Sequence, residues 1–215
     1  MPLIQESSRQ NEARPKAPSP YRSPDELLIR AAAEDWGRAR WPGRRVIHEL
    51  GMGRGSVRAD VVFVGPDALS AVEIKSAYDN ADRLINQLAM FRLSAPDVWL
   101  IHDARHGRDA ALMGYLLPSI GLVEASVQSG VATLRVTREA TDFVPDLECL
   151  VSLLWVEELR TAATLLGSRV PARATHAALR KVVMEAGYDA ALRAVCHALR
   201  GRSTLWRADA PILGN

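Results

Sequence analysis

Residues 57–75, VRADVVFVGPDALSAVEIK, contain the pattern that decides the fold. Apolar and β-branched residues dominate 57–64 and 69–75, and the segment between these runs is Gly-Pro-Asp-Ala, which is typical of a turn. We expect the two runs to pair as an antiparallel hairpin that turns at 65–68. This hairpin fixes which side chains face one another, and the chemistry of the chain follows from it.

The register of the hairpin brings charged residues together. Positions 60 and 73 face each other when 64 pairs with 69, so Asp60 lies opposite Glu73. Side chains alternate along a strand, so Glu73 shares its face with Lys75, while Val72 and Ile74 point the other way. Directly opposed carboxylates have Cβ atoms roughly 5 Å apart and repel each other unless a positive charge lies between them. A divalent metal would supply that charge.

These residue types suit the hydrolysis of a phosphodiester bond. Carboxylate oxygens hold Mg²⁺, the metal polarises the phosphate and lowers the pKa of a bound water, and a lysine stabilises the developing negative charge. Asp60 and Glu73 are the predicted ligands, and Lys75 orients the water or stabilises the transition state. The alternative is a structural hairpin with a cross-strand ion pair, and the spacing alone favours neither.

The composition adds weight to Lys75. Only three lysines occur in the chain, Lys16, Lys75 and Lys181, so 24 of its 27 basic residues are arginine. A compact ammonium group beside a metal and a phosphate is not interchangeable with a guanidinium. A lysine at this position therefore favours the catalytic interpretation slightly.

The 215 residues, 48% of them hydrophobic, are enough for one sizeable core. No apolar run approaches the roughly 20 residues of a membrane-spanning helix, and we expect a cytoplasmic protein with no membrane partner. Cys149 and Cys196 lack CxxC spacing, which favours buried, reduced thiols over a disulfide or a zinc site. The chain contains no HExxH, Walker, Gly-x-Ser-x-Gly or dinucleotide-binding signature.

The residues before the hairpin predict an arm, a helix and a strand. Residues 1–22 lack periodicity and predict a disordered arm. Ser23-Pro24-Asp25-Glu26 predicts a helix start with a capping box, and the helix extends to about Arg38. Its predicted inward stripe is Leu28, Ala32 and Trp36. A short strand at 46–50 follows, and pairing it with 57–64 places Glu49 opposite Asp60 as a third carboxylate.

The residues after the hairpin alternate between helix and strand. A helix at 81–93 is expected to face inward with Leu84, Ile85, Leu88 and Phe91. Residues 98–102 predict a buried strand parallel to its neighbour. The further expected elements are a helix at 108–118, a second hairpin at 121–127 and 131–136, and helices at 146–166, 172–186 and 188–200.

The C-terminal part of the chain is basic. The net charge of the whole chain is only +2, yet residues 159–207 contain nine basic and two acidic side chains. Such a segment fits against a phosphate backbone, and it fits equally well as a solvated face of an arginine-rich protein.

The expected elements follow the order helix, three strands, helix and strand, with an acid on the second strand and Glu-x-Lys on the third. In this order the chain resembles the PD-(D/E)XK nuclease superfamily. The closer likeness is to a little-characterised bacterial and phage branch. Its motifs are present here as Glu49-Leu50, Arg58-Ala59-Asp60, Glu73-Ile74-Lys75-Ser76 and Arg83-Leu84-Ile85-Asn86-Gln87. The likeness covers residues 45–106 well and thins beyond them. Ala59 replaces the proline that names the motif, and Phe91 stands where the branch has tyrosine.

The resemblance implies an α/β fold with a restriction-endonuclease-like core of order α-β-β-β-α-β, a mixed central sheet and a C-terminal helical extension. The chain then divides into the arm at 1–22, the core at 23–145 and a helical subdomain at 146–207. The implied catalytic residues are Asp60, Glu73, Lys75 and Gln87, and the implied ligands of Mg²⁺ or Mn²⁺ are Glu49, Asp60, Glu73 and Ile74. The residues expected to contact nucleic acid are Arg58, Arg83, Arg180 and Lys181.

The expected function is a Mg²⁺- or Mn²⁺-dependent deoxyribonuclease. The alternative is an inactive nuclease-fold module that binds nucleic acid or a protein partner. DNA is the expected substrate, but nothing in the sequence reads a 2′-hydroxyl, so RNA stays open. The oligomeric state is open as well, a homodimer included.

Overall fold

The structure is a computed structural model that describes residues 23–203 and 207–212. The predicted disordered arm at 1–22 lies outside the described residues, as do residues 204–206 of the predicted helical subdomain. In chain order the elements are α1 (Pro24–Arg40), β1 (Arg45–Met52), β2 (Val57–Val64), β3 (Leu69–Lys75), α2 (Leu84–Ser94), β4 (Asp97–Asp103), the 3₁₀ turn η1 (Ala104–His106), α3 (Gly107–Leu116), β5 (Gly121–Gln128), β6 (Val131–Arg138), α4 (Leu147–Val151), α5 (Val156–Leu165), α6 (His176–Glu185) and α7 (Tyr188–Gly201).

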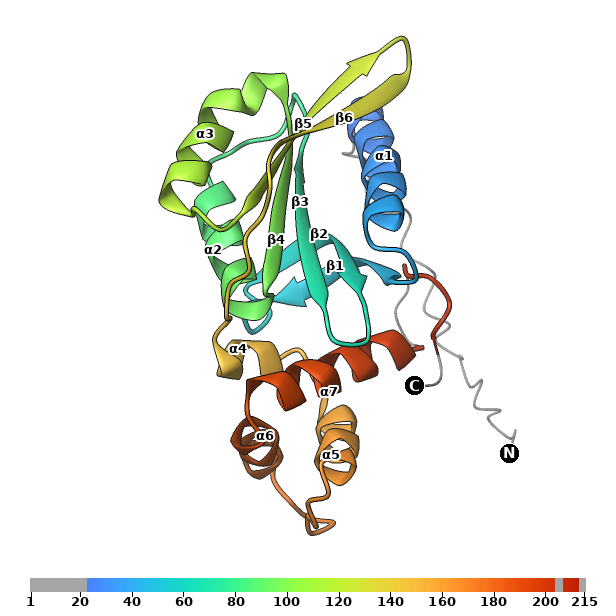
Figure 1. Ribbon diagram of the computed structural model, residues 1–215, viewed down its shortest axis with the longest axis vertical. Helices are drawn as coiled ribbons and strands as arrows, with labels where there is room; N and C mark the ends of the chain where they lie inside the picture. Colours follow the sequence, from blue (N-terminus) through green and yellow to red (C-terminus); the bar gives the residue numbers. More distant parts are fainter. Residues whose placement is uncertain (1–22, 204–206, 213–215) are drawn as a thin grey trace, which may run out of the picture.

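Within the described residues, six strands form one mixed sheet in chain order, β1 to β6. The strands β1, β2 and β3 are antiparallel neighbours, β3, β4 and β5 run parallel, and β5 and β6 form a terminal hairpin. The two parallel steps are crossovers through α2 and through η1 and α3 (Figure 1). The expected α/β class, the order helix, three strands, helix, strand, and the parallel pairing of 98–102 are confirmed.

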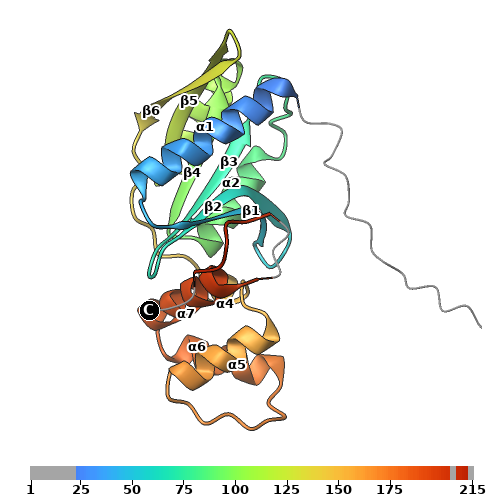
Figure 2. The same cartoon turned by 90° about the vertical axis from the view of Figure 1, so that its right-hand side faces the viewer.

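Helices cover both faces of the sheet. Helix α1 packs on one face, where Ile29 and Ala33 join a core built on Phe63, Trp99 and neighbouring strand residues. Helices α2 and α3 pack on the opposite face, where Leu88 belongs to a second and larger core. Figures 1 and 2 show the sheet between these two layers.

The buried stripe of α1 differs from the expected one. The buried positions are Ile29, Arg30, Ala33 and Gly37, whereas Leu28, Ala32 and Trp36 are only partly buried. The cause is a close approach at position 37, because a Cβ atom there would lie 2.0 Å from the ring of Phe63. The helix backbone packs directly on this ring, and the helix is therefore rotated so that its buried stripe lies one residue after the expected one.

Other helix boundaries also differ from the expectation. Helix α6 begins at His176 instead of 172, after the N-cap Thr175. Helix α2 begins at Leu84 instead of 81, because Asn80 accepts the N–H of Asp82 in a local turn that competes with the helix. The predicted helix at 146–166 is two helices, α4 and α5, separated at 152–155. The carboxylate of Glu158 accepts the backbone N–H of Trp155 and so starts a new helix. In α2, Leu84, Leu88 and Phe91 are buried as expected, but Ile85 is exposed.

The C-terminal helices lie at one end of the sheet and share the core on the α2 face (Figure 1). Residues 207–209 then return to β1, where the N–H groups of His48 and Asp209 bond to the carbonyls of Arg207 and Val46. Buried Arg45 ties this segment to α7, donating to the carbonyls of Leu199 and Asp209. The segment covers the outer edge of β1, an edge that would otherwise offer unpaired backbone groups.

The predicted state of both cysteines is confirmed, since Cys149 and Cys196 are buried and unpaired. Burial raises the pKa of the Cys196 thiol to about 12, which makes this thiol unreactive. None of the helices in the described ranges has the length and apolar character needed to cross a membrane.

Candidate functional site

The site lies where β2 and β3 separate. Their ladder runs from the pair Val64 and Leu69 to the pair Val61 and Val72, which is the predicted register. Beyond it, Oδ2 of Asp60 accepts the backbone N–H of Ile74 at 2.8 Å. The carboxylate thus takes the place of a strand partner for this N–H, and the two strands diverge.

Glu49 on β1 is brought to the same place by an irregular backbone. Its neighbours in the ladder pair as His48 with Val61 and Leu50 with Ala59, which is the predicted register, although Glu49 and Asp60 themselves do not form a ladder pair. Its φ angle is +56°, a left-handed conformation that is uncommon for a residue with a side chain. Such strain clusters at functional sites.

Arg30 of α1 is the residue of this site that the sequence analysis missed. Its side chain is 2% exposed, and Nη2 lies 2.6 Å from Oδ1 of Asp60, 3.3 Å from Oε1 of Glu26 and 3.7 Å from Oε1 of Glu49. A second nitrogen, Nη1, donates to the backbone carbonyl of Asp60 at 2.9 Å. Burial acts to lower the pKa of Arg30, but Asp60 and Glu49 outweigh it and raise the pKa above its ordinary value. The sequence feature that could have indicated Arg30 is its spacing from Glu26, because residues four apart lie on the same flank of a helix.

Glu73 and Lys75 form the inner part of the site. The Glu73 side chain is 3% exposed, and Nζ of Lys75 lies 2.9 Å from its Oε1. Nζ also donates to Oε1 of Gln87 on α2 at 3.2 Å, as the family resemblance implied for a helix residue that reaches the site. The second oxygen of Glu73, Oε2, is buried and makes no hydrogen bond.

The electrostatics of Glu73 are unusual for a carboxylate. Burial and then the charge of Asp60 raise its pKa to about 8, although Lys75 opposes the shift. Glu73 therefore holds a proton near neutral pH unless a further positive charge is added. A pKa shifted by burial and a specific neighbour in a pocket is typical of functional sites.

Eight of the ten predicted site residues line one pocket of about 680 Å³. Asp60, 21% exposed, connects the buried pair to solvent. The lining residues are Glu26, Glu49, Gly51, Gly55, Ser56, Val57, Arg58, Asp60, Glu73, Ile74, Lys75, Asp79, Asn80, Arg83, Asn86 and Gln87. Arg58 and Arg83 lie at the margin of the pocket, and both are exposed. The Arg58 side chain is 65% exposed, and its Nη1 lies 3.8 Å from Oε2 of Glu49.

Arg180 and Lys181 lie elsewhere, on α6 among the C-terminal helices. Arg180 donates to the carbonyl of Glu148 at 2.8 Å and is largely buried. Lys181 is 72% exposed and lies 3.6 Å from Glu185. The structure does not bring these two residues to the pocket.

The donor groups in the pocket fit some metals and not others. Among the described residues, no group of three or more His, Cys, Asp and Glu side chains is placed to hold a metal ion. Zinc and calcium sites need about three or more protein ligands. Mg²⁺ instead usually keeps several of its waters and binds through one or two carboxylates. The buried, unbonded Oε2 of Glu73 is an acceptor that a cation would satisfy. Asp60, Glu73 and the backbone of Ile74 therefore fit Mg²⁺ or Mn²⁺.

Fold and pocket together define an α/β protein with a mixed sheet and a polar pocket where two strands separate. Residues 31–208 match the family of bacteriophage P4 protein cII, and the chain belongs to this family. No curated protein and no solved structure matches the chain. The family description names a phage protein without an activity.

Proposed function

We propose that this protein is a metal-dependent nuclease, with a restriction-endonuclease-like core, that hydrolyses phosphodiester bonds of DNA in the pocket between β2, β3 and α2. The observation that carries the proposal is the buried Glu73, paired with Lys75 through one oxygen and unbonded at the other. Asp60 lies beside it in the same pocket. Two carboxylates and a lysine in one pocket are the groups that phosphodiester hydrolysis requires.

Asp60 and Glu73 would hold the metal together with the Ile74 backbone. Glu49, the fourth predicted ligand, lines the same pocket, but the described residues do not place it with Asp60 and Glu73 as a group of three metal-holding carboxylates. When bound, Mg²⁺ or Mn²⁺ polarises the phosphate and lowers the pKa of a water molecule. The chain holds Asp60 in place from two sides, through the Ile74 N–H and the Arg30 guanidinium. Glu73 must lose its proton before its carboxylate can act as a ligand, so its raised pKa couples metal binding to proton release.

The remaining residues of the pocket act on the substrate. The Lys75 ammonium group, held between Glu73 and Gln87, provides a fixed positive charge for the phosphoryl oxygens as negative charge develops. Arg58 and Arg83 at the margin are exposed and can contact the phosphates on either side of the cleaved bond.

The test is cleavage of supercoiled plasmid and of single-stranded DNA with Mg²⁺ or Mn²⁺. We expect Asp60→Asn and Lys75→Met to lower the cleavage rate by about 100-fold or more, as loss of a key charge at an active site does. Lys181→Met is the matched control, since Lys181 is the other lysine in the described part of the chain and is far more exposed. Circular dichroism checks that each variant is folded.

The proposal fails if Asp60→Asn and Lys75→Met both cut at the wild-type rate. Cutting that persists in excess chelator would also contradict it. An RNA of the same sequence, tested beside the DNA, determines which nucleic acid is the substrate.

A second candidate function is a module of the same fold that binds nucleic acid without cutting it. The observation in its favour is Arg30, which already supplies a positive charge to Asp60, Glu49 and Glu26 without any metal. This candidate predicts DNA binding that weakens strongly with salt, is unchanged by chelator and is accompanied by no cleavage. Loss of binding in chelator would contradict it.

A further inference from the structure

An exposed tyrosine stands three residues after Lys75. The side chain of Tyr78 is 72% exposed, and the guanidinium carbon of Arg105 lies 5.3 Å from the centre of its ring. Arg105 is exposed as well. A scattered apolar side chain on a surface needs no explanation, but this ring is paired with a cation and placed beside the candidate site.

The turn that carries Tyr78 is held by several hydrogen bonds. Both the backbone N–H and the hydroxyl of Ser76 donate to Oδ2 of Asp79, at 2.6 and 2.7 Å, and the N–H of Asp79 donates to the carbonyl of Ser76. Nε2 of the buried His106 lies 2.9 Å from the same carbonyl and donates to it. The ring is therefore presented from a fixed backbone, which lowers the entropy lost when a ligand packs on it.

Arg105 is held from the neighbouring strand. It lies in η1, directly after β4, and its backbone N–H donates to Oδ1 of Asp103 at 2.9 Å. The strands β3 and β4 are parallel neighbours, so the residues that follow them lie side by side at the same end of the sheet. Tyr78 and Arg105 thus form one surface, built from the ends of two adjacent strands.

This surface adjoins the pocket. Asp79 and Asn80, the two residues that follow Tyr78, line the pocket, as does Lys75 before it. Arg58 and Arg83 line the pocket too and can contact the phosphates of a bound strand. Tyr78 thus lies in the chain between residues that line the pocket.

We propose that Tyr78 and Arg105 form a base-stacking subsite for single-stranded DNA at the margin of the pocket. The faces of bases in a duplex are covered by their neighbours, whereas an unpaired base offers a face to an aromatic ring and to a guanidinium plane. Stacking of this kind accepts every base, so the subsite selects for strand state and not for sequence. The role of the subsite in cleavage rests on the proposed nuclease function, whereas its binding of single strands does not.

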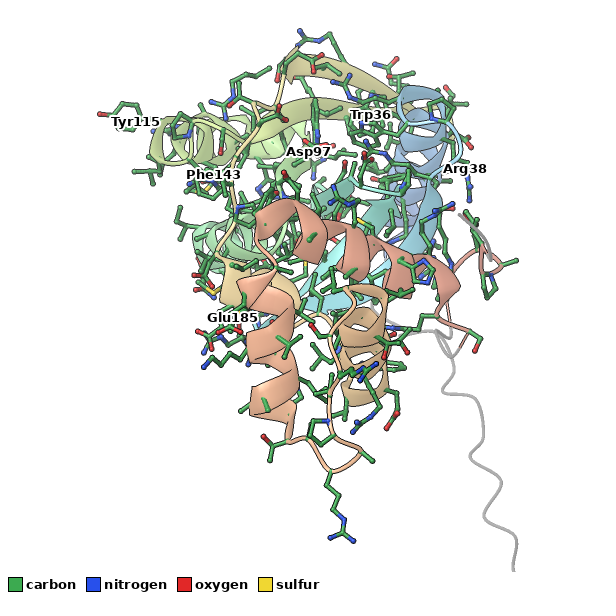
Figure 3. The ribbon with its side chains drawn as sticks, turned by 60° about the horizontal axis from the view of Figure 1, so that its bottom comes forward. Trp36, Arg38, Asp97, Tyr115, Phe143 and Glu185 are labelled. Atoms are coloured by element: carbon green, nitrogen blue, oxygen red, sulfur yellow. The ribbon has the colours of Figure 1, made fainter. Side chains whose placement is uncertain are left out.

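The test is fluorescence anisotropy of a labelled 20-nucleotide oligo(dT) and of a 20-base-pair duplex, with full-length protein in excess EDTA. Base stacking predicts that Tyr78→Ala weakens single-strand affinity by about tenfold. Tyr78→Phe, which keeps the ring, stays within about twofold of wild type, and duplex affinity changes little in either variant. Tyr115→Ala is the matched control, because Tyr115 is 83% exposed and extends outward from α3 (Figure 3).

Three results would overturn the subsite: wild-type affinity for oligo(dT) in Tyr78→Ala, an equal loss of duplex affinity, or an equal loss in Tyr115→Ala. Absence of measurable oligo(dT) binding by the wild type would overturn it too. EDTA removes cleavage from the measurement, so the outcome is independent of the nuclease proposal. If the protein cleaves DNA but Tyr78→Ala does not change binding, the subsite is rejected and the nuclease proposal stands. If binding changes as expected but no cleavage is found, the nuclease proposal is rejected and the subsite stands.

Discussion

Replacing Glu73 by glutamine should remove a pH dependence from the stability of the metal-free protein. The pKa of Glu73 is raised to about 8 by burial and by Asp60, against an ordinary value of 4.5. Between these two values the folded protein keeps a proton that the unfolded chain has released. Raising the pH then favours the unfolded chain, so the contribution of this group to stability is complete below about pH 4.5 and is lost as the pH approaches 8. Glutamine has nearly the same shape and does not titrate.

The magnitude follows from the proton that differs between the two states. Each pH unit over which one proton is bound only in the folded state changes the free energy of unfolding by about 1.4 kcal/mol. The unfolded chain is already largely deprotonated at pH 5, so the wild type should lose about 2.5 kcal/mol between pH 5 and pH 7 from this group alone. With a slope of roughly 2 kcal/mol/M in urea, that loss lowers the unfolding midpoint by about 1 M.

The assay is urea unfolding in EDTA at pH 5, 6 and 7 for wild type, Glu73→Gln and Glu124→Gln. Glu124 is a carboxylate at the surface, paired with the exposed Arg135, and serves as the matched control. The midpoint of Glu73→Gln should rise relative to wild type as the pH increases, while Glu124→Gln follows the wild type. Parallel pH profiles for wild type and Glu73→Gln would refute the reasoning.

Two further predictions concern the elements that hold the site in place. Gly37→Ala should lower the free energy of unfolding by about 1–3 kcal/mol, because the new Cβ atom would meet the ring of Phe63. Gly107→Ala is the control and should cost nothing, since a Cβ atom there meets nothing within 4 Å. Thermal unfolding measures both variants, and equal losses would contradict the packing of Gly37 on Phe63. Arg30→Met should destabilise the metal-free protein by about 3 kcal/mol, because it removes the buried cation beside Asp60 and Glu49. Arg38→Met removes an ion pair with Asp209 at the surface and should cost less than about 1 kcal/mol. Urea unfolding in EDTA measures both variants, and a smaller loss for Arg30→Met than for Arg38→Met would show that Arg30 does not stabilise the site.

The sequence was sufficient for the hairpin and for the residues that it brings together. Strand pairing has a period of two and a register set by the turn, so placing the turn at 65–68 also placed Asp60 and Glu73 in the same pocket, although the ladder ends one pair before them. The register of β1 with β2 followed in the same way and placed Glu49 in this pocket as well. These predictions depend only on local geometry, which a sequence pattern contains.

Contacts between distant elements were less predictable. Arg30 looks like an ordinary helix residue until α1 is laid across the sheet, and its place among three carboxylates depends on the rotation of that helix. The rotation is set by the fit of Gly37 onto Phe63, two residues on different elements with no pattern that links them. Arg180 and Lys181 stood out by charge alone, and charge does not indicate on which side of a molecule a helix packs.

The most direct test of the proposed site is calorimetric titration of Mn²⁺ into metal-free wild type, Asp60→Asn and Glu73→Gln in the absence of nucleic acid. We predict that wild type binds Mn²⁺ with release of a proton, since Glu73 is protonated near neutral pH without the metal, and that each variant loses the binding. Proton release is measured by repeating the titration in buffers of different ionisation enthalpy. No binding by the wild type, or unchanged binding by Asp60→Asn, would contradict the account.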